Sequence, residues 1–195
     1  VTGLIQPLID VLNSDGYSVS VSNKKYKEQS ISNVDIIVIA TPMAKSYKHF
    51  FQKYKGAFRK KELIVLNNWV KKGGSILMFS EHFPFDTAIE PLLNSFNIET
   101  SIGETLDSEH SKEGPIVFTN ERLEFNHPII SGKRKVKSVA TYGGSALKGN
   151  NYTNLMKLSN NARNVEHSWM FAKKGPIGNG YSQGLAGSFG TVSYT

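Results

Sequence analysis

The spacing of apolar residues in the first half of the chain alternates between helical and strand patterns. The run VDIIVIA (34–40) is unbroken and largely β-branched, and SILMF (75–79) is a second short apolar run. Such runs are typical of parallel strands that are covered on both faces. Helical spacing precedes each run, in LIQPLIDVL (4–12) and in KELIVLNNWVKKGG (61–74). The alternation predicts an α/β protein, a three-layer αβα sandwich with a mainly parallel sheet.

Weaker patterns predict the remaining elements. YSVSV (17–21) alternates with period two, which indicates a half-buried strand. DTAIEPLLNSF (86–96) has helical spacing, and its proline has to start or kink that helix. KKGPIGNGYSQG (173–184) is a loop by composition. Trp69 shares a helical face with other apolar residues, so we expect it to pack against the sheet. Short strands are expected at IVFT (116–119), VKSVATY (136–142) and NLMKL (154–158).

Polar residues follow both long apolar runs directly. Thr41 comes after the first run, and Ser80, Glu81 and His82 come after the second. The carboxyl ends of parallel strands open into one crevice, which is where open α/β sheets bind ligands. These four residues are therefore candidates for ligand binding, and Glu81 and His82 are also candidates for an acid–base pair. Alternatively, Glu81 and His82 only cap or orient the start of the next helix.

Apart from these residues, the sequence offers one glycine-containing turn as a candidate binding segment and lacks the common catalytic and metal-binding motifs. The backbone at Gly143, in TYGGSA, could line a ligand-binding crevice, or form only a tight turn. The sequence has no HExxH spacing, no phosphate-binding glycine loop and no GxSxG around Ser80. It also has no cysteine, which excludes a thiol nucleophile, a disulfide framework and a cysteine zinc site. We therefore expect no metal and no cofactor.

The chain carries a net charge of +7. Its basic residues gather in NKKYK (23–27), KYKGAFRKK (53–61) and GKRKVK (132–137). These clusters could serve an anionic surface, but no nucleic-acid-binding motif accompanies them, so a solvated surface is expected instead of a nucleic-acid partner. No stretch approaches 18 consecutive apolar residues, so no membrane span is expected. The compartment, cytoplasmic or extracytoplasmic, stays open.

Several sequence segments, in the same order along nearly the whole chain, resemble those of a known protein family. They are PLIDVLNSDGYSVSV, VDIIVIATP, ELIVLNNWVKKGGSILMFSEHFPF, HPIISG and QGLAGSFGTVSYT. Together they resemble a family of largely uncharacterised bacterial proteins with a class I glutamine amidotransferase-like, flavodoxin-like fold. That family is related to a domain of gliding-motility ABC-transporter components and of an intraflagellar transport protein. The resemblance implies one domain over residues 1–195, trimmed at both ends relative to the family.

The same resemblance bears on function. The family usually has Asp-His-x-Pro-Phe after its second strand, and here His82, Pro84 and Phe85 match while Glu81 replaces the aspartate. True amidotransferases place a cysteine nucleophile in this region, so glutamine hydrolysis by that route is excluded. The resemblance implies a non-catalytic domain that binds a small molecule or a protein partner. The alternative is a hydrolase that uses His82 and Glu81, with or without a metal, and whether the chain is an enzyme stays open.

Overall fold

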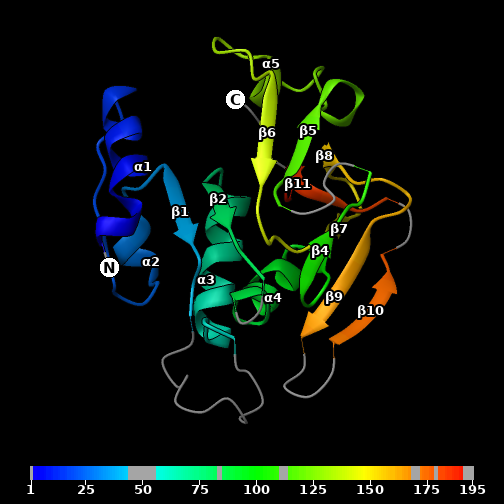
Figure 1. Cartoon of the computed structure of the whole chain (residues 1–195). Helices are drawn as coiled ribbons and strands as arrows, with labels where there is room; N and C mark the ends of the chain where they lie inside the picture. Colours follow the sequence, from blue (N-terminus) through cyan, green and yellow to red (C-terminus); the bar gives the residue numbers. More distant parts are fainter. Residues whose placement is uncertain are drawn as a thin grey trace.

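A parallel pair of strands and three antiparallel groups make up the β-structure of the described residues. The computed structural model describes residues 2–43, 56–82, 85–109, 114–167, 172–177 and 180–190. Within these residues the strands pair as β1-β2, β10-β9-β4, β3-β7-β11-β8 and β5-β6 (Figure 1). The strands are β1 (Ile36–Ala40), β2 (Ser75–Phe79), β3 (Ile98–Thr100), β4 (Glu104–Leu106), β5 (Ile116–Thr119), β6 (Ser138–Thr141), β7 (Leu147–Gly149), β8 (Thr153–Lys157), β9 (Arg163–His167), β10 (Ala172–Pro176) and β11 (Ser182–Ala186).

The helices lie mostly in the first half of the chain, as the apolar spacing predicts. The two long helices predicted from the sequence are present, and the Pro91 segment forms a third. The helices are α1 (Thr2–Ser14), α2 (Glu28–Ile31), α3 (Lys60–Lys71), α4 (Phe85–Ser95) and α5 (Pro128–Ser131), with a short 3₁₀ turn, η1 (Asn120–Arg122). In the described part of the chain, no helix is long and apolar enough to cross a membrane.

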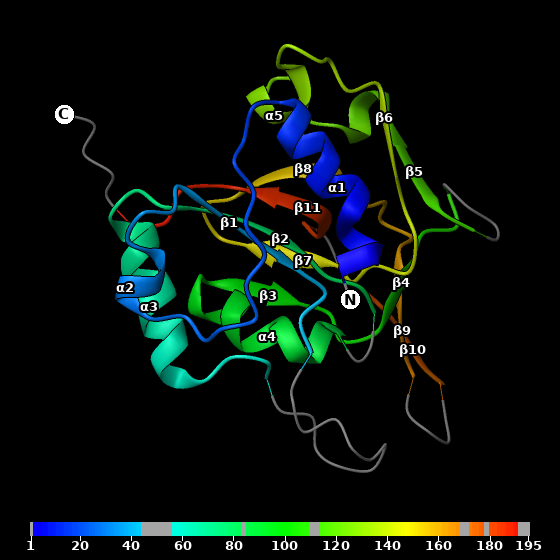
Figure 2. The same ribbon diagram turned by 90° about the vertical axis from the view of Figure 1, so that its left-hand side faces the viewer.

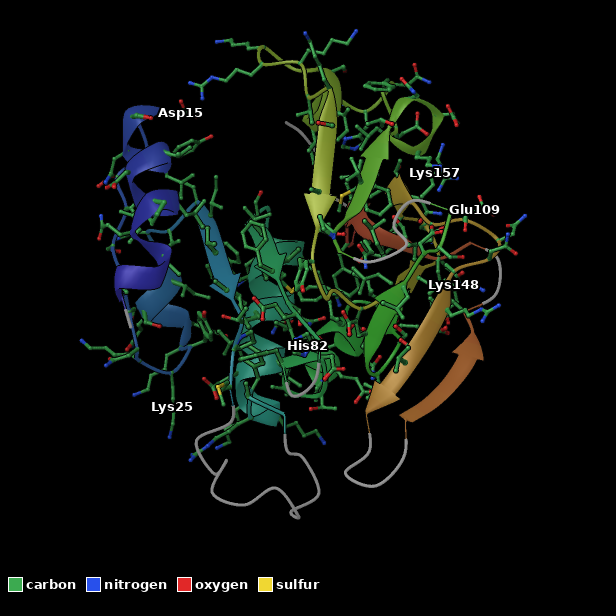
Figure 3. All side chains as sticks on the ribbon, in the orientation of Figure 1. Asp15, Lys25, His82, Glu109, Lys148 and Lys157 are labelled. Carbon is green, nitrogen blue, oxygen red and sulfur yellow. The ribbon has the colours of Figure 1, made fainter. Side chains whose placement is uncertain are left out.

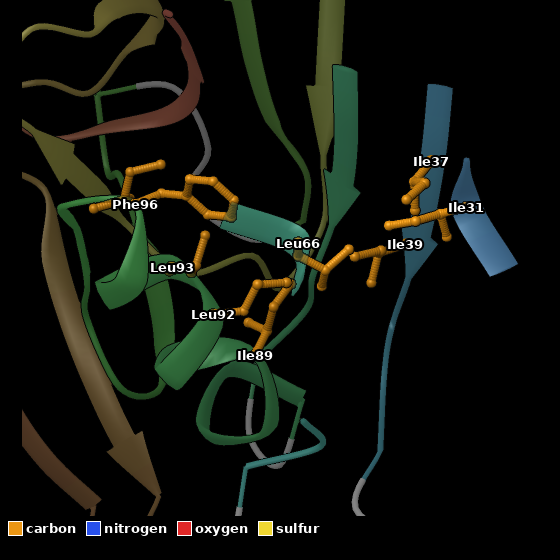
Figure 4. Close-up of a cluster of buried hydrophobic side chains, with 9 residues drawn as sticks. Ile31, Ile37, Ile39, Leu66, Ile89, Leu92, Leu93 and Phe96 are labelled. Atoms are coloured by element: carbon orange, nitrogen blue, oxygen red, sulfur yellow. The ribbon is translucent and has the colours of Figure 1, made fainter. Parts of the chain in front are cut away.

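The main core lies on one face of the β1–β2 pair. The two strands run parallel, from the pairing of Ile36 with Ser75 to that of Ala40 with Phe79. Apolar side chains of β1 meet those of α3 and α4, where Leu66 is fully buried (Figure 4). The core comprises Ile31, Ile37, Ile39, Leu66, Ile89, Leu92, Leu93, Phe96 and Ile98. This packing buries one stripe of each helix and one face of the strands.

The prediction of a mainly parallel three-layer sandwich is wrong. Among the described strands only β1 and β2 pair in parallel, and the other named pairs are antiparallel. The physical reason is the second half of the chain, where short strands follow one another without crossover helices. Strands joined in this way, such as β9 and β10, pair antiparallel. The chain after α4 therefore does not continue the β1–β2 sheet but forms separate antiparallel sheets.

Three local predictions also differ from the structure. The apolar runs of β1 and β2 are covered on one face only, and on the other face Leu77 is 42% and Phe79 43% exposed. The segment 17–21 forms no strand. The predicted loop 173–184 contains most of β10 and the start of β11. The three errors have the same cause. A local pattern shows which residues could pair or be covered, but whether they are depends on strands and helices from distant parts of the chain.

A second core lies under β5, apart from the first. Phe118 is fully buried in it, with Ile116 from the same strand. The remaining members are Leu123 directly after η1, Ile130 of α5 and Leu155 of β8. Two separate buried clusters therefore stabilise the described part of the chain.

Trp69 packs against the main core, as its helical face predicts, but it is only half-buried. A Cβ atom at Gly74 would lie 2.4 Å from its indole ring, so the absence of a side chain there lets the ring rest on the backbone before β2.

Candidate functional site

The carboxyl ends of β1 and β2 lie at the same edge, as parallel pairing requires. The Thr41 backbone N–H donates to the carbonyl oxygen of Phe79 over 3.0 Å, so the pairing extends one residue past β1. Thr41 and Ser80 are therefore brought together. Thr41 has a φ of +39°, which a β-branched residue adopts only where its surroundings impose it.

Ser80 and Glu81 directly follow β2. The Ser80 hydroxyl donates to the backbone carbonyl of Glu81 over 3.3 Å. The Glu81 side chain is exposed, whereas His82 is half-buried. A nucleophilic serine needs a base within hydrogen-bond reach, whereas this hydroxyl donates to the backbone carbonyl of the next residue.

His82 lies against Gly143, which is in the turn after β6. Gly143 follows β6 with a φ of +67°, a left-handed conformation that suits glycine. A Cβ atom there would lie 2.8 Å from Cδ2 of His82 and 3.7 Å from Oε1 of Glu104. The missing side chain thus lets the imidazole and the carboxylate of Glu104 approach the turn closely. Figure 3 shows His82 beyond the carboxyl end of β2.

Asp86 is a buried carboxyl group beside this histidine. It lies in the first turn of α4, is fully buried, and accepts the backbone N–H groups of Gly103 over 2.6 Å and of Thr87 over 2.5 Å. Burial raises the pKa of Asp86 to about 6, against the lowering effects of those two hydrogen bonds and of His82. The carboxyl group therefore fastens the start of α4 to the turn before β4.

His82, Asp86, Glu104 and Gly143 together form what we call the carboxyl-edge cluster. The cluster places an imidazole among carboxylates beside an exposed turn, a setting that can bind a polar group or exchange a proton. No three histidine or carboxylate side chains among the described residues are arranged to hold a metal ion. Sequence reasoning missed Asp86 and Glu104, because neither belongs to a motif and the burial of a carboxyl group depends on distant parts of the chain.

Replacing Gly143 by Ala tests the packing of this cluster. We expect a loss of about 1–2 kcal/mol in unfolding free energy from the left-handed backbone. We also expect a shift of the His82 imidazole resonances in NMR spectra, because the new methyl group must displace the ring.

Gly180→Ala is the matched control. Gly180 has a similar φ of +85°, but a Cβ atom added there would lie 4.0 Å from the Cε atom of Lys148, at ordinary contact distance. The control should cost similar stability and leave the His82 resonances in place. Identical His82 spectra in the two variants would show that Gly143 does not support the ring.

A groove lies at the opposite end of the parallel pair. It has a volume of about 820 Å³ and runs between α2 and α3, where Asp35, Trp69 and Lys72 line it. None of the site residues predicted from the sequence lines this groove. Thr41, Ser80, Glu81, His82 and Gly143 share the carboxyl edge, and their role in binding a ligand stays a prediction.

A second network of polar side chains lies near η1 and connects segments that are distant in the sequence. The buried carboxylate of Asp107 accepts the backbone N–H of Ser159 over 2.8 Å and the hydroxyl of the same residue over 2.6 Å. Arg122 lies 3.7 Å from Asp107 and pairs with Glu109 over 3.1 Å. These contacts join three distant segments, so we interpret the network as structural.

The comparisons with known proteins include a solved structure of similar fold. No family model matches the chain, and no curated protein matches it either. The mmIFT52 N-terminal domain aligns with a TM-score of 0.56 and 16% sequence identity, over 84% of this chain and 72% of that domain. At this identity the likeness shows the fold alone. It supports the intraflagellar-transport part of the kinship expected from the sequence, but not the amidotransferase-like fold, the bacterial origin or the relation to transporter components.

Proposed function

We propose that this chain is a non-catalytic domain that binds a protein partner. The observation that carries the proposal is the open outer face of the β1–β2 pair. Leu77 and Phe79 project from this face with 42% and 43% of their surface exposed, and Ile36 on the neighbouring strand is 42% exposed. On the paired strand, Val38 lies opposite Leu77 and Ala40 lies opposite Phe79. A contiguous apolar surface of this kind is a common mark of a protein-binding site.

The site residues favour binding over catalysis. The Ser80 hydroxyl donates to the backbone carbonyl of Glu81, and the chain has no cysteine. Asp86 accepts backbone N–H groups, which is the role of a helix-start residue.

A photo-crosslinking experiment tests the proposal. A benzoylphenylalanine placed at Phe79 should capture one discrete partner from cells that produce the protein. The same group placed at Val117, which is 39% exposed on β5, should not. The captured protein is then purified, and its affinity for the unmodified chain is measured.

We expect Phe79→Lys to weaken that affinity by about tenfold or more, roughly 1.4 kcal/mol, because a charge replaces an apolar contact. Val117→Lys should leave it unchanged. Circular dichroism and thermal unfolding establish that both variants fold. Equal affinities for the two variants would show that the outer face does not bind the partner.

The hydrolase alternative makes a different prediction. If His82 is catalytic, turnover of a panel of esters and amides should be measurable and should disappear in His82→Ala. We expect no turnover that depends on His82. Turnover that this substitution abolishes would replace the binding proposal with the alternative.

A further inference from the structure

The connection between α5 and β6 concentrates positive charge at one end of the molecule. Its sequence, GKRKVK (132–137), holds four cations, and residues 125–138 contain no acidic side chain. All four cations are exposed: Lys133, Arg134, Lys135 and Lys137. Figures 1 and 2 show this connection at the top of the molecule in both views, so it belongs to a projecting end. We call residues 127–137 the basic tip.

The basic tip is anchored to the body of the protein. The backbone N–H of Val136 donates to the carbonyl oxygen of Ile130 over 2.9 Å. Ile130 is buried in the second core, and the side chain of Val136 packs against that core. The ammonium group of Lys135 lies 5.8 Å from the centre of the Phe125 ring. The cations are therefore presented by a loop of defined conformation.

Only part of this charge is neutralised within the protein. Arg134 pairs with Asp15, which directly follows α1. Glu124, the nearest acidic residue before the tip, pairs with Lys157 over 2.9 Å. Among the described residues, no ion pair involves the three lysines of the tip. These three cations are free to meet an anionic partner.

An apolar side chain stands beside these cations. Ile129 in α5 is 61% exposed, and its backbone N–H donates to Nδ1 of His127 over 3.2 Å, which fixes the turn. A Cβ atom at Gly132 would lie 2.8 Å from the carbonyl oxygen of Pro128, so glycine lets the chain turn sharply from α5 into the cations. Single exposed apolar side chains are common. An apolar side chain next to a cluster of cations is instead typical of segments that lie on membranes.

Charge and apolar exposure together define the partner. A nucleic-acid backbone offers phosphates but no apolar layer for Ile129. A folded acidic protein would need a hollow shaped to receive the projecting end. A bilayer with anionic lipids is flat, carries phosphates at its surface and has hydrocarbon directly beneath them. It therefore matches the lysines, the isoleucine and the shape at once.

We propose that the basic tip docks the protein on an anionic membrane surface. The lysines of residues 133–137 meet lipid phosphates, and Ile129 inserts between the headgroups. This site lies on other elements than the outer face of the β1–β2 pair. Its failure would leave the proposed protein-partner site untouched, and the reverse also holds.

Co-sedimentation of the purified chain with lipid vesicles tests the proposal. Vesicles of phosphatidylcholine with roughly one third phosphatidylglycerol should bind the chain, whereas vesicles of phosphatidylcholine alone should not. Added salt should weaken the binding, because it screens the attraction between the lysines and the headgroups. Equal binding to both kinds of vesicle, or binding to neither, would overturn the proposal.

A triple variant removes the lysines of the tip: Lys133→Gln, Lys135→Gln and Lys137→Gln. It should bind the anionic vesicles about 100-fold more weakly, since each cation near such a surface contributes about fivefold. The matched control removes the same charge from exposed lysines of another segment: Lys24→Gln, Lys25→Gln and Lys27→Gln. The control should weaken binding by no more than about threefold, because those lysines do not touch the membrane. Equal losses in the two variants would show that net charge alone attracts the vesicles.

Ile129→Ser tests insertion separately from charge. It should weaken binding to the anionic vesicles by about fivefold and leave the melting temperature unchanged, because the side chain is exposed. Ile64→Ser, at a 52% exposed position on α3, is the matched control and should bind like the native chain. Equal binding of Ile129→Ser and the native chain would show that the isoleucine does not insert.

A fluorescent label reports where the chain meets the vesicle. The native sequence has no cysteine, so Ile129→Cys can carry one environment-sensitive fluorophore. Its emission should move to shorter wavelength when anionic vesicles are added, and the same label at Lys25→Cys should not respond. Binding to polyglutamate as tight as to the vesicles, with no response of the label at position 129, would identify an acidic protein as the partner and overturn the membrane assignment.

Discussion

Replacing Phe118 by Ala should lower the free energy of unfolding by about 3–5 kcal/mol. Phe118 is fully buried at the centre of the second core, where strand β5 meets residues from η1, α5 and β8. The substitution removes the apolar contacts of the ring and leaves a cavity that the surrounding strands can fill only in part.

Val117→Ala is the control for this prediction. Val117 is the preceding residue of β5 but is 39% exposed on the opposite face, so its truncation should change stability by only about 0.5 kcal/mol. Urea denaturation followed by circular dichroism gives both values. A loss for Phe118→Ala within about 1 kcal/mol of the control would mean that this cluster does not stabilise the fold.

The buried carboxyl group of Asp86 should make stability depend on pH. Burial raises its pKa from 3.8 to about 6 in the folded chain. Between those two values the folded state holds a proton that the unfolded state has released. The contribution of Asp86 to stability is therefore fully present below about pH 4 and is lost as the pH rises through 6, by roughly 2–3 kcal/mol in total.

Asp86→Asn isolates this effect. The amide keeps the shape of the side chain but replaces one acceptor oxygen. The cost of this replacement is the same at every pH, so it cancels when the stability difference between native chain and variant is compared at two pH values. The unfolding free energy of the native chain minus that of the variant should be more favourable at pH 4 than at pH 7. Asp35→Asn, at an exposed carboxyl group, is the matched control. A native-minus-variant difference that stays constant from pH 4 to pH 7 would show that Asp86 does not titrate in this range.

Local periodicity predicts the elements of the first half of the chain because each element carries its own pattern. The helical spacing in 61–74 and the apolar runs of β1 and β2 are all realised. The pattern cannot show whether both faces of a strand are covered, since coverage depends on which distant element arrives. Phe79 is apolar in sequence and exposed in the structure for this reason. In the second half the short strands take their direction from long-range pairing, which no local pattern encodes.

The candidate site was predictable where it follows from strand direction. Thr41 and Ser80 meet because parallel strands end at one edge. Gly143 lies against His82 although some sixty residues separate them along the chain. The sequence indicated only that the turn at Gly143 could line a crevice. Asp86 and Glu104 were not predicted. They come together because the tertiary fold brings residues 103–104 to the start of α4, and no local sequence pattern indicates this contact.

The central claim is that a protein partner binds at the outer face of the β1–β2 pair. Amide hydrogen exchange of the chain, measured alone and saturated with the partner captured through Phe79, tests it most directly. We expect exchange in β1 and in β2 to slow by about tenfold or more when the partner is bound. Unchanged exchange in both segments, with slowed exchange elsewhere, would contradict the claim.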